Sequence, residues 1–423
     1  MGNFWRKLKL VSKDKGLRNR ILFVLGALVL FRMLAVIPIP GIDTLRLEQF
    51  FSSNEFFGLL NIFSGGGLSS LSIVMLGVAP YITGSIIMQL LTMMSEKLKQ
   101  MYQEEGEAGR RKFAQYSRLL TIPLAVVQGY AFLTLFQRQG VIDSLSSIDL
   151  ITNIVVITAG SVFLMWLGEL ITEFGIGNGV SLLIFSGIVA GIPTSIIQLS
   201  ATFTISQLPV IIGFLVGSLL ITYGVVVITE AERPIPITYA KKVRGNKVYG
   251  GVSTYLPLRL NQAGVIPIIF ALSLLLFPQM IFNFLSGVDN SIVQRISTII
   301  FDFINNPWLF SLFYFFLVFL FTYFYTAVTF DPDSISKNLQ RSGAFIPGVR
   351  PGQSTSDYIA RVLTRITLVG ATFLGVIAVI PLIIRSLTGI SSLAIGGTGL
   401  LIAVSVVIDL VKKIDAQISM REY

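Results

Sequence analysis

The chain has 423 residues, of which 53% are hydrophobic and 13% charged, and it carries a formal net charge of +10. Its mean hydropathy of +0.78 lies far above that of soluble globular domains and indicates a membrane protein. The chain has no Cys and no His, which excludes thiolate and imidazole metal sites, disulfides, Cys nucleophiles and His general bases.

Ten apolar runs follow one another along the chain, each close to the length of about 20 residues that spans a bilayer as a helix. They lack the short alternating pattern of an outer-membrane barrel, so the sequence predicts an all-α, polytopic membrane protein. The first run ends in "IPIPG" without a small-residue cleavage site, so we expect a retained helix rather than a signal peptide. The runs cover residues 21–40, 73–94, 116–137, 150–168, 180–200, 208–229, 263–284, 308–330, 366–384 and 393–411.

Positive charges concentrate in alternate loops. Of the 32 Lys and Arg residues, 27 lie before the first run, in the loops after the second, sixth and eighth runs, or in the tail. Because short cytoplasmic loops collect Lys and Arg, we expect both termini in the cytoplasm. The turn after the fourth run holds Glu169 and Glu173 but no positive charge, so only alternation fixes its side.

Charges inside the runs are few. Arg32 is the one strong charge well inside a run, and we expect the chain to leave the membrane by Pro38, about 9 Å further on at about 1.5 Å per residue. We expect Arg32 to reach the interface or to form a structural pair, in preference to a functional role. Asp409 ends the last run, and no pair of carboxylates is available for a proton relay or aspartyl chemistry. This argues against an enzyme and against an ion-coupled transporter.

Three cytoplasmic loops are long enough to have a function, and two of them have distinctive sequences. The loop after the sixth run predicts a hairpin with a basic tip, and the loop after the eighth contains "SGAFIPGVRPG", whose Pro and Gly residues rigidify the backbone around Arg350. On composition alone, topology signals attracted to anionic lipid are favoured over specific docking sites. The basic tip holds Lys241, Lys242, Arg244 and Lys247.

Six motifs in order make the chain resemble the SecY family, the channel subunits of the bacterial protein-conducting translocon, nearly from end to end. The motifs are "PYITGSII", "EEGEAGRRKFAQYSR", "GIGNGVSLLIFSGIVAG", "STYLPLRLNQAGVIPIIF", "GAFIPGVRPG" and "GGTGLLIAV".

The resemblance implies ten transmembrane helices in two pseudo-symmetric halves around an hourglass pore, although no repeat is visible in the sequence. The expected halves are residues 1–200 and 201–412, followed by a cytoplasmic tail at 413–423. The second half would carry the cytoplasmic loops 230–261 and 331–365.

In this family the waist of the pore is a ring of aliphatic side chains, and a narrow apolar constriction gates by dewetting. From the residues alone, the matching positions would be ordinary helix packing or lipid-facing side chains. The matching residues are Ile82, Ile86, Ile184, Ile188, Ile269 and Ile402.

The family also gives a role to the stretch "NIFSGGGLSSLSIVMLG", because the segment matching about residues 62–72 forms a short helix that plugs the resting channel. Each glycine weakens a helix by about 1 kcal/mol, which would let the plug leave. A flexible connection between the first two helices is the alternative. The expected plug residues are Ser64, Gly65, Gly66, Gly67, Leu68, Ser69, Ser70 and Leu71.

The family opens sideways to lipid between its helices 2 and 3 on one side and 7 and 8 on the other. Here Gln128 is expected to give the gate polarity, and Pro80, Pro123 and Pro267 are candidates for helix kinks. In the family the loops after helices 6 and 8 contact the motor ATPase SecA or the ribosome. The residues expected to dock these partners are Lys241, Lys242, Arg244, Lys247 and Arg350.

The resemblance therefore implies a channel, not an enzyme, that moves unfolded secretory polypeptides across the bacterial cytoplasmic membrane and transmembrane segments laterally into it. Its expected partners are SecE-type and SecG-type small membrane subunits, SecA, the ribosome, signal peptides, nascent polypeptides and lipids, and no cofactor is implied. A phosphate-binding loop is absent from the sequence, so the energy must come from a partner or from the membrane potential. A secondary transporter of small solutes is the alternative function.

Overall fold

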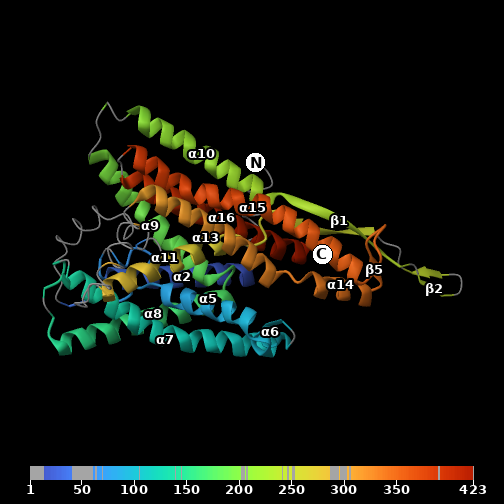
Figure 1. Cartoon of the computed structure of the whole chain (residues 1–423), viewed down its shortest axis with the longest axis horizontal. Helices are drawn as coiled ribbons and strands as arrows, with labels where there is room; N and C mark the ends of the chain where they lie inside the picture. Colours follow the sequence, from blue (N-terminus) through green and yellow to red (C-terminus); the bar gives the residue numbers. More distant parts are fainter. Residues whose placement is uncertain are drawn as a thin grey trace.

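The computed structural model is a helical bundle whose described residues include ten long helices, most of which run roughly along the long axis of the molecule (Figure 1). It describes residues 14–40, 61, 64–68, 70–103, 105–138, 140–143, 145–201, 205, 208–240, 242–244, 247–249, 253–285, 295, 303, 306–388 and 391–422. The long helices are α2 (Lys15–Val36), α5 (Ala79–Met94), α7 (Gly106–Arg138), α8 (Ser147–Phe174), α9 (Gly179–Ala201), α10 (Leu208–Glu230), α11 (Ile266–Leu285), α13 (Pro307–Thr329), α15 (Gln353–Thr388) and α16 (Ser391–Glu422).

Each of the ten predicted runs is matched by one of these helices, as the sequence predicted. Among the described residues, six helices are long and apolar enough to cross a membrane. Five of them lie within α2, α7, α8, α10 and α15, and the sixth, Pro307–Arg341, covers α13 and continues to Arg341. Shorter apolar helices cover Ala79–Met94, Gly179–Pro193 and Ile266–Leu275. The remaining run lies within α16.

Several helix ends differ from the ends of the apolar runs. Helix α7 begins at Gly106 rather than 116, and α15 begins at Gln353 rather than 366. The added turns of α7 contain Glu, Arg, Lys, Gln and Ala, which favour helix, and those of α15 mix Gln, Ala, Arg and Leu with Ser and Thr. Because many of these residues are polar, hydropathy alone underestimates the length of both helices. Helix α5 begins at Ala79 rather than 73, because residues 73–78 form turns.

The three prolines proposed as helix kinks occupy different positions in their helices. Pro80 lies in the first turn of α5 and Pro267 is the second residue of α11, where the missing N–H would have no helical partner. The expectation that these two prolines kink helices is therefore wrong. Pro123 lies inside α7.

Two small sheets and two short helices extend the bundle at one end, where β2 is the outermost labelled element (Figure 1). The predicted hairpin is confirmed, since β1 (Glu232–Tyr239) pairs antiparallel with β4 (Ser253–Arg259). Strands β2 (Lys242–Arg244) and β3 (Lys247–Tyr249) pair at its tip. Strand β5 (Ala344–Phe345) adds to β1 from the loop after α13, which the sequence did not indicate. The short helices are α6 (Glu96–Gln103) and α14 (Pro332–Arg341).

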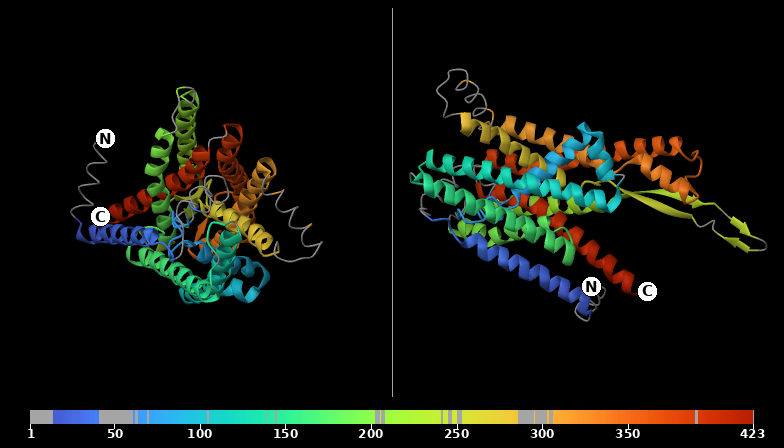
Figure 2. Two further views of the ribbon diagram at one scale, coloured as in Figure 1. Left: turned by 90° about the vertical axis from the view of Figure 1, so that its left-hand side faces the viewer. Right: turned by 90° about the horizontal axis from the view of Figure 1, so that it is seen from below.

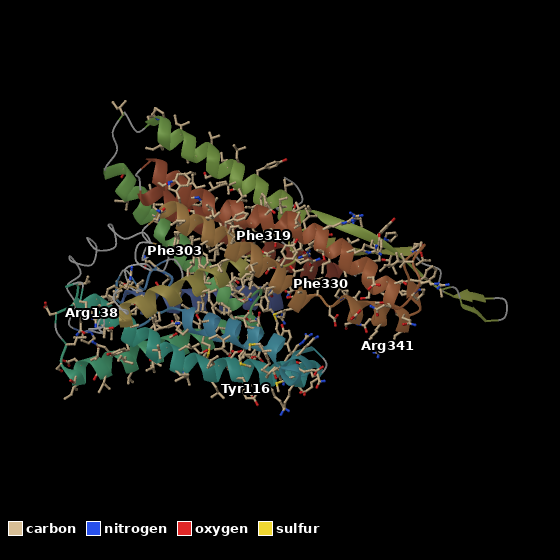
Figure 3. All side chains as sticks on the ribbon, in the orientation of Figure 1. Tyr116, Arg138, Phe303, Phe319, Phe330 and Arg341 are labelled. Carbon is tan, nitrogen blue, oxygen red and sulfur yellow. The ribbon has the colours of Figure 1, made fainter. Side chains whose placement is uncertain are left out.

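The basic segments gather at the end of the bundle that carries the hairpin. The start of α2 and the end of α16 lie toward this end (Figure 2). Arg341 lies there too, whereas Arg138 lies at the opposite end (Figure 3). Arg118 Nε on α7 pairs with Glu169 Oε1 on α8 at 2.6 Å, so the turn after α8 lies at the same end as the basic start of α7. The ion pair therefore shows at which end of the bundle this turn lies, which the count of positive charges did not determine.

Candidate functional site

The six isoleucines of the predicted ring belong to one large apolar cluster that joins several helices of the bundle. Five are among its buried residues, and Ile188, which is half-buried, packs against the cluster. They come from four helices, and the contacts of α5 with α11 and of α9 with α16 link early and late parts of the chain. We call Ile82, Ile86, Ile184, Ile188, Ile269 and Ile402 the isoleucine cluster.

The segment after α2, residues 64–68, 70 and 71, passes beside this cluster; we call it the glycine segment. Its residues form successive turns, so the expected short helix over 62–72 is wrong for the described part of that range. Gly65 and Gly66 adopt φ of 68° and 86°, a left-handed backbone that glycine adopts readily and that interrupts a right-handed helix. Ser69 of the predicted plug lies outside the described residues.

Gly65 is enclosed between two helices. A Cβ at Gly65 would overlap the ring of Phe31 on α2, and a Cβ at Gly187 on α9 would overlap the Cα of Gly65. Gly187 lies between Ile184 and Ile188 in sequence, so the glycine segment touches α9 where two members of the isoleucine cluster arise. Only glycine at both positions permits this approach.

Hydrogen bonds tie the glycine segment to α2. Arg32 Nη1 donates to the Gly65 carbonyl oxygen at 2.6 Å, and Ser70 Oγ donates to the Ala35 carbonyl oxygen at 2.8 Å. Just beyond α2, the amide N–H of Ile39 donates to the Leu71 carbonyl oxygen at 2.9 Å. The expected structural pair of Arg32 is therefore made with a backbone carbonyl rather than with a carboxylate.

The leucines of the glycine segment fix its other side. Leu68 and Leu71 are 2% and 0% exposed and belong to a second apolar cluster with side chains of α7 and α8. Ser64 Oγ accepts from the Leu68 N–H at 2.9 Å and donates to the Asn61 carbonyl oxygen at 3.0 Å, which closes the first turn. The glycine segment is thus packed on both sides.

Comparisons with known proteins agree on one family. The family model SecY matches residues 72–411. The chain is 41% identical over 421 residues to Protein translocase subunit SecY of Synechococcus elongatus, which covers 98% of this chain and 95% of the relative. The chain belongs to the SecY family. The SecY of Thermus thermophilus is also 41% identical, over 431 residues that cover 99% of this chain and 96% of the relative.

Solved structures share the SecY fold at low sequence identity. A protein-conducting channel matches with a TM-score of 0.61 at 20% identity, covering 94% of this chain and 92% of that one. A structure concerned with the plug domain of SecY, which stabilises the closed state of the translocation channel, matches with a TM-score of 0.64 at 18% identity, covering 96% and 93%. These likenesses support the ten-span SecY fold for a multi-pass membrane protein.

The helices that would form the lateral gate of a SecY protein pack against each other. Helix α11 contacts both α5 and α7. Gln128 on α7 is 3% exposed, so its amide lies inside the protein rather than toward lipid. Its role at a gate stays a prediction.

The two loops predicted to bind partners differ in how far the structure describes them. Lys242, Arg244 and Lys247 belong to the paired strands β2 and β3, whereas Lys241 lies outside the described residues. Arg350 is exposed, and a hydrogen bond holds its backbone in place. Thr355 Oγ1 donates to the Arg350 carbonyl oxygen at 2.8 Å. The turn is further held by Ser336 Oγ, which donates to the Gly352 carbonyl oxygen at 2.6 Å.

Sequence reasoning missed two members of the site, Arg32 and Gly187. Arg32 carried a signal, since it is the one strong charge well inside an apolar run and therefore needs a partner. Gly187 carried none, because glycine is common in membrane helices.

Proposed function

We propose that the chain is a protein-conducting channel, with the isoleucine cluster as its pore ring and the glycine segment as its plug. One observation carries this proposal: Gly65 of the glycine segment lies against Gly187, between two isoleucines of the cluster. A packed segment that meets a central aliphatic constriction has the form of a seal.

The chemistry of the cluster suits the task. Aliphatic side chains in a narrow passage exclude water and ions by dewetting. They offer no fixed polar group that would retain a passing polypeptide. A secondary transporter needs the opposite, since its substrate and coupling ions are held by polar groups near the bilayer midplane. The aliphatic character of the cluster therefore favours the channel over the small-solute transporter.

A lateral opening fits the contacts of α11. Parting α11 and α13 from α5 and α7 would expose the pore to lipid and give a segment inside it access to the bilayer. Selection would then follow partition, because apolar helices gain free energy by entering the hydrocarbon and charged ones lose it. Gln128 would contribute polarity to this seam.

The positive charges and the family together indicate where the chain lies and what binds it. We place the chain in the bacterial cytoplasmic membrane with both termini in the cytoplasm, because the basic segments gather at the hairpin end of the bundle. Residues 1–200 and 201–412 would form the two halves around the pore, with 413–423 as a cytoplasmic tail. SecE-type and SecG-type subunits, SecA and the ribosome would bind this channel, and a partner or the membrane potential would supply the energy.

A cysteine crosslink tests the proposal, because the chain has no native cysteine. Ile82→Cys is combined with a cysteine in a secretory precursor arrested in the membrane, and disulfide formation is measured. Ile197→Cys is the matched control, since this isoleucine on α9 is 65% exposed on the outside of the bundle.

We expect a crosslink at Ile82 and none at Ile197. A complex that contains the arrested precursor but shows no crosslink at Ile82 would contradict the ring assignment. Failure of any such complex to form, in membranes that hold the chain and its partners, would favour the transporter.

A further inference from the structure

Arg32 is held directly against the glycine segment. Its guanidinium bonds to the Gly65 carbonyl oxygen at 2.6 Å, and a Cβ added at Gly66 would lie 3.4 Å from Nη1. Arg32 is half-buried, whereas Val29 and Met33 of the same helix are 60% and 64% exposed. The one strong charge of the first apolar run therefore turns away from the outer surface of α2 and toward the glycine segment.

We propose that Arg32 is a positioning residue that holds the glycine segment against the isoleucine cluster and so keeps the channel closed; this rests on the proposed channel function. A bond from an ionised donor is about twice as strong as one between neutral groups. Because a charge away from bulk water needs a partner, the Gly65 carbonyl stabilises the guanidinium as much as the guanidinium stabilises the segment.

The hydrogen bond between Arg32 and Gly65 can form only while the glycine segment is in its closed position. An interaction shifts a conformational equilibrium only if it differs between the two states. Gly65 lies between Phe31 and Gly187, and its carbonyl oxygen accepts the hydrogen bond from Arg32. The glycine segment therefore cannot move away from α9 without moving this carbonyl oxygen. Displacement of the segment therefore breaks this bond, whereas the helical hydrogen bonds of α2 remain.

The neutral bond from Ser70 Oγ to the Ala35 carbonyl oxygen lies about one helical turn further along α2. It ties the same segment to the same helix without a charge. Arg32 and Ser70 thus form two side-chain ties of different strength, and we expect loss of the Arg32 tie to have the larger effect on closure.

The test measures ion leak through the resting channel in proteoliposomes that hold the complete complex and no precursor. Arg32→Met removes all guanidinium donors and keeps an unbranched apolar side chain. We expect the leak to rise about tenfold, which corresponds to about 1.4 kcal/mol. Arg20→Met is the matched control, because Arg20 is exposed on the same helix, and we expect it to leave the leak unchanged.

A disulfide that holds the glycine segment on α2 distinguishes displacement of this segment from misfolding of the variant. Cysteines at Ser70 and Ala35 are oxidised in the Arg32→Met background, where the hydrogen bond between the two residues places the segment beside α2. We expect the disulfide to return the leak to the wild-type value and reductant to raise it again. A leak that persists in the locked protein would overturn the proposal, as would a wild-type leak in Arg32→Met.

A second variant is ready if Arg32→Met does not accumulate in the membrane. Arg32→Gln keeps a polar side chain that is too short and uncharged to replace the tie, and Arg20→Gln is its control. We again expect a raised leak, and an unchanged leak would overturn the proposal. Precursor transport by the wild-type protein is measured in parallel, so that failure of the channel function itself is seen separately.

Discussion

Gly65 and Gly187 touch, backbone to backbone, so closely that a Cβ on Gly187 would overlap the Cα of Gly65. One residue belongs to the segment after α2 and the other to α9, so their contact joins two parts of the chain that are far apart in sequence. Ile184 and Ile188 flank Gly187 in sequence. The contact therefore links the glycine segment to the isoleucine cluster.

Gly187→Ala should weaken this contact. The added methyl group has no room, so either the glycine segment or α9 must shift, which costs about 1–3 kcal/mol for an overpacked interior. We expect the resting ion leak to rise severalfold while precursor transport continues.

Gly191→Ala is the control for this substitution, since a Cβ at Gly191 meets nothing within 4 Å on the same helix. Both variants change the helix propensity of α9 in the same direction. An equal leak in the two variants would show that the contact with Gly65 does not seal the channel.

The helices could be predicted from the sequence because each follows from a local property. An apolar run of membrane length predicts a helix wherever it occurs, and the alternating charges of the loops predict which helix ends lie together. The hairpin of β1 and β4 was also predictable, since it closes locally around a short tip. Helix ends were less accurate, because polar and charged residues continue α7 and α15 beyond the bilayer-length runs.

The contacts of the site could not be predicted in the same way. The bond from Arg32 to Gly65 and the approach of Gly187 join residues far apart in the chain, and no periodicity records such a pair. The plug helix was expected by analogy with the family. The left-handed backbone of Gly65 and Gly66 forms turns there instead.

A polar side chain inside the isoleucine cluster should open a path for water. Ile184 is 1% exposed, so Ile184→Asn buries an amide, which costs about 1–3 kcal/mol when no partner is present. Hydration of the amide relieves this cost and wets the constriction. We expect a lower melting temperature and a higher resting leak.

Ile196→Asn provides the comparison, because Ile196 is 61% exposed on the same helix. This variant places an amide on the outer surface of α9 and should not change the leak of correctly inserted protein. A leak that rises as much in Ile196→Asn as in Ile184→Asn would remove the isoleucine cluster as the seal.

The ion pair between Arg118 and Glu169 should couple α7 to α8. Its side chains are 45% and 21% exposed, so water screens it only in part, and we expect a coupling energy of about 1 kcal/mol, near the upper end for exposed pairs. The measurement is a double-mutant cycle on thermal unfolding in detergent with Arg118→Gln and Glu169→Gln.

The pair of Arg111 with Glu107 is a suitable reference for this cycle. Its side chains are 78% and 82% exposed and lie within one helix, so we expect a coupling of about 0.3–0.5 kcal/mol or less. Added salt should weaken both pairs, because exposed charges are screened. A coupling between Arg118 and Glu169 no larger than in the reference pair would mean that these helices are held by packing alone.

Arg350→Glu should impair transport without affecting insertion into the membrane. The hydrogen bonds of Thr355 and Ser336 fix the backbone of the turn, so the substitution reverses an exposed charge on a rigid support and leaves the fold intact. If this turn docks a motor ATPase or a ribosome, charge reversal slows association, and we expect precursor transport to fall about tenfold, within the range of electrostatic rate effects.

Arg341→Glu, at the exposed end of α14, is the control and should transport nearly as the wild type. The difference between the two variants should shrink at high ionic strength. Unchanged transport by Arg350→Glu at low salt would exclude the turn as a docking site.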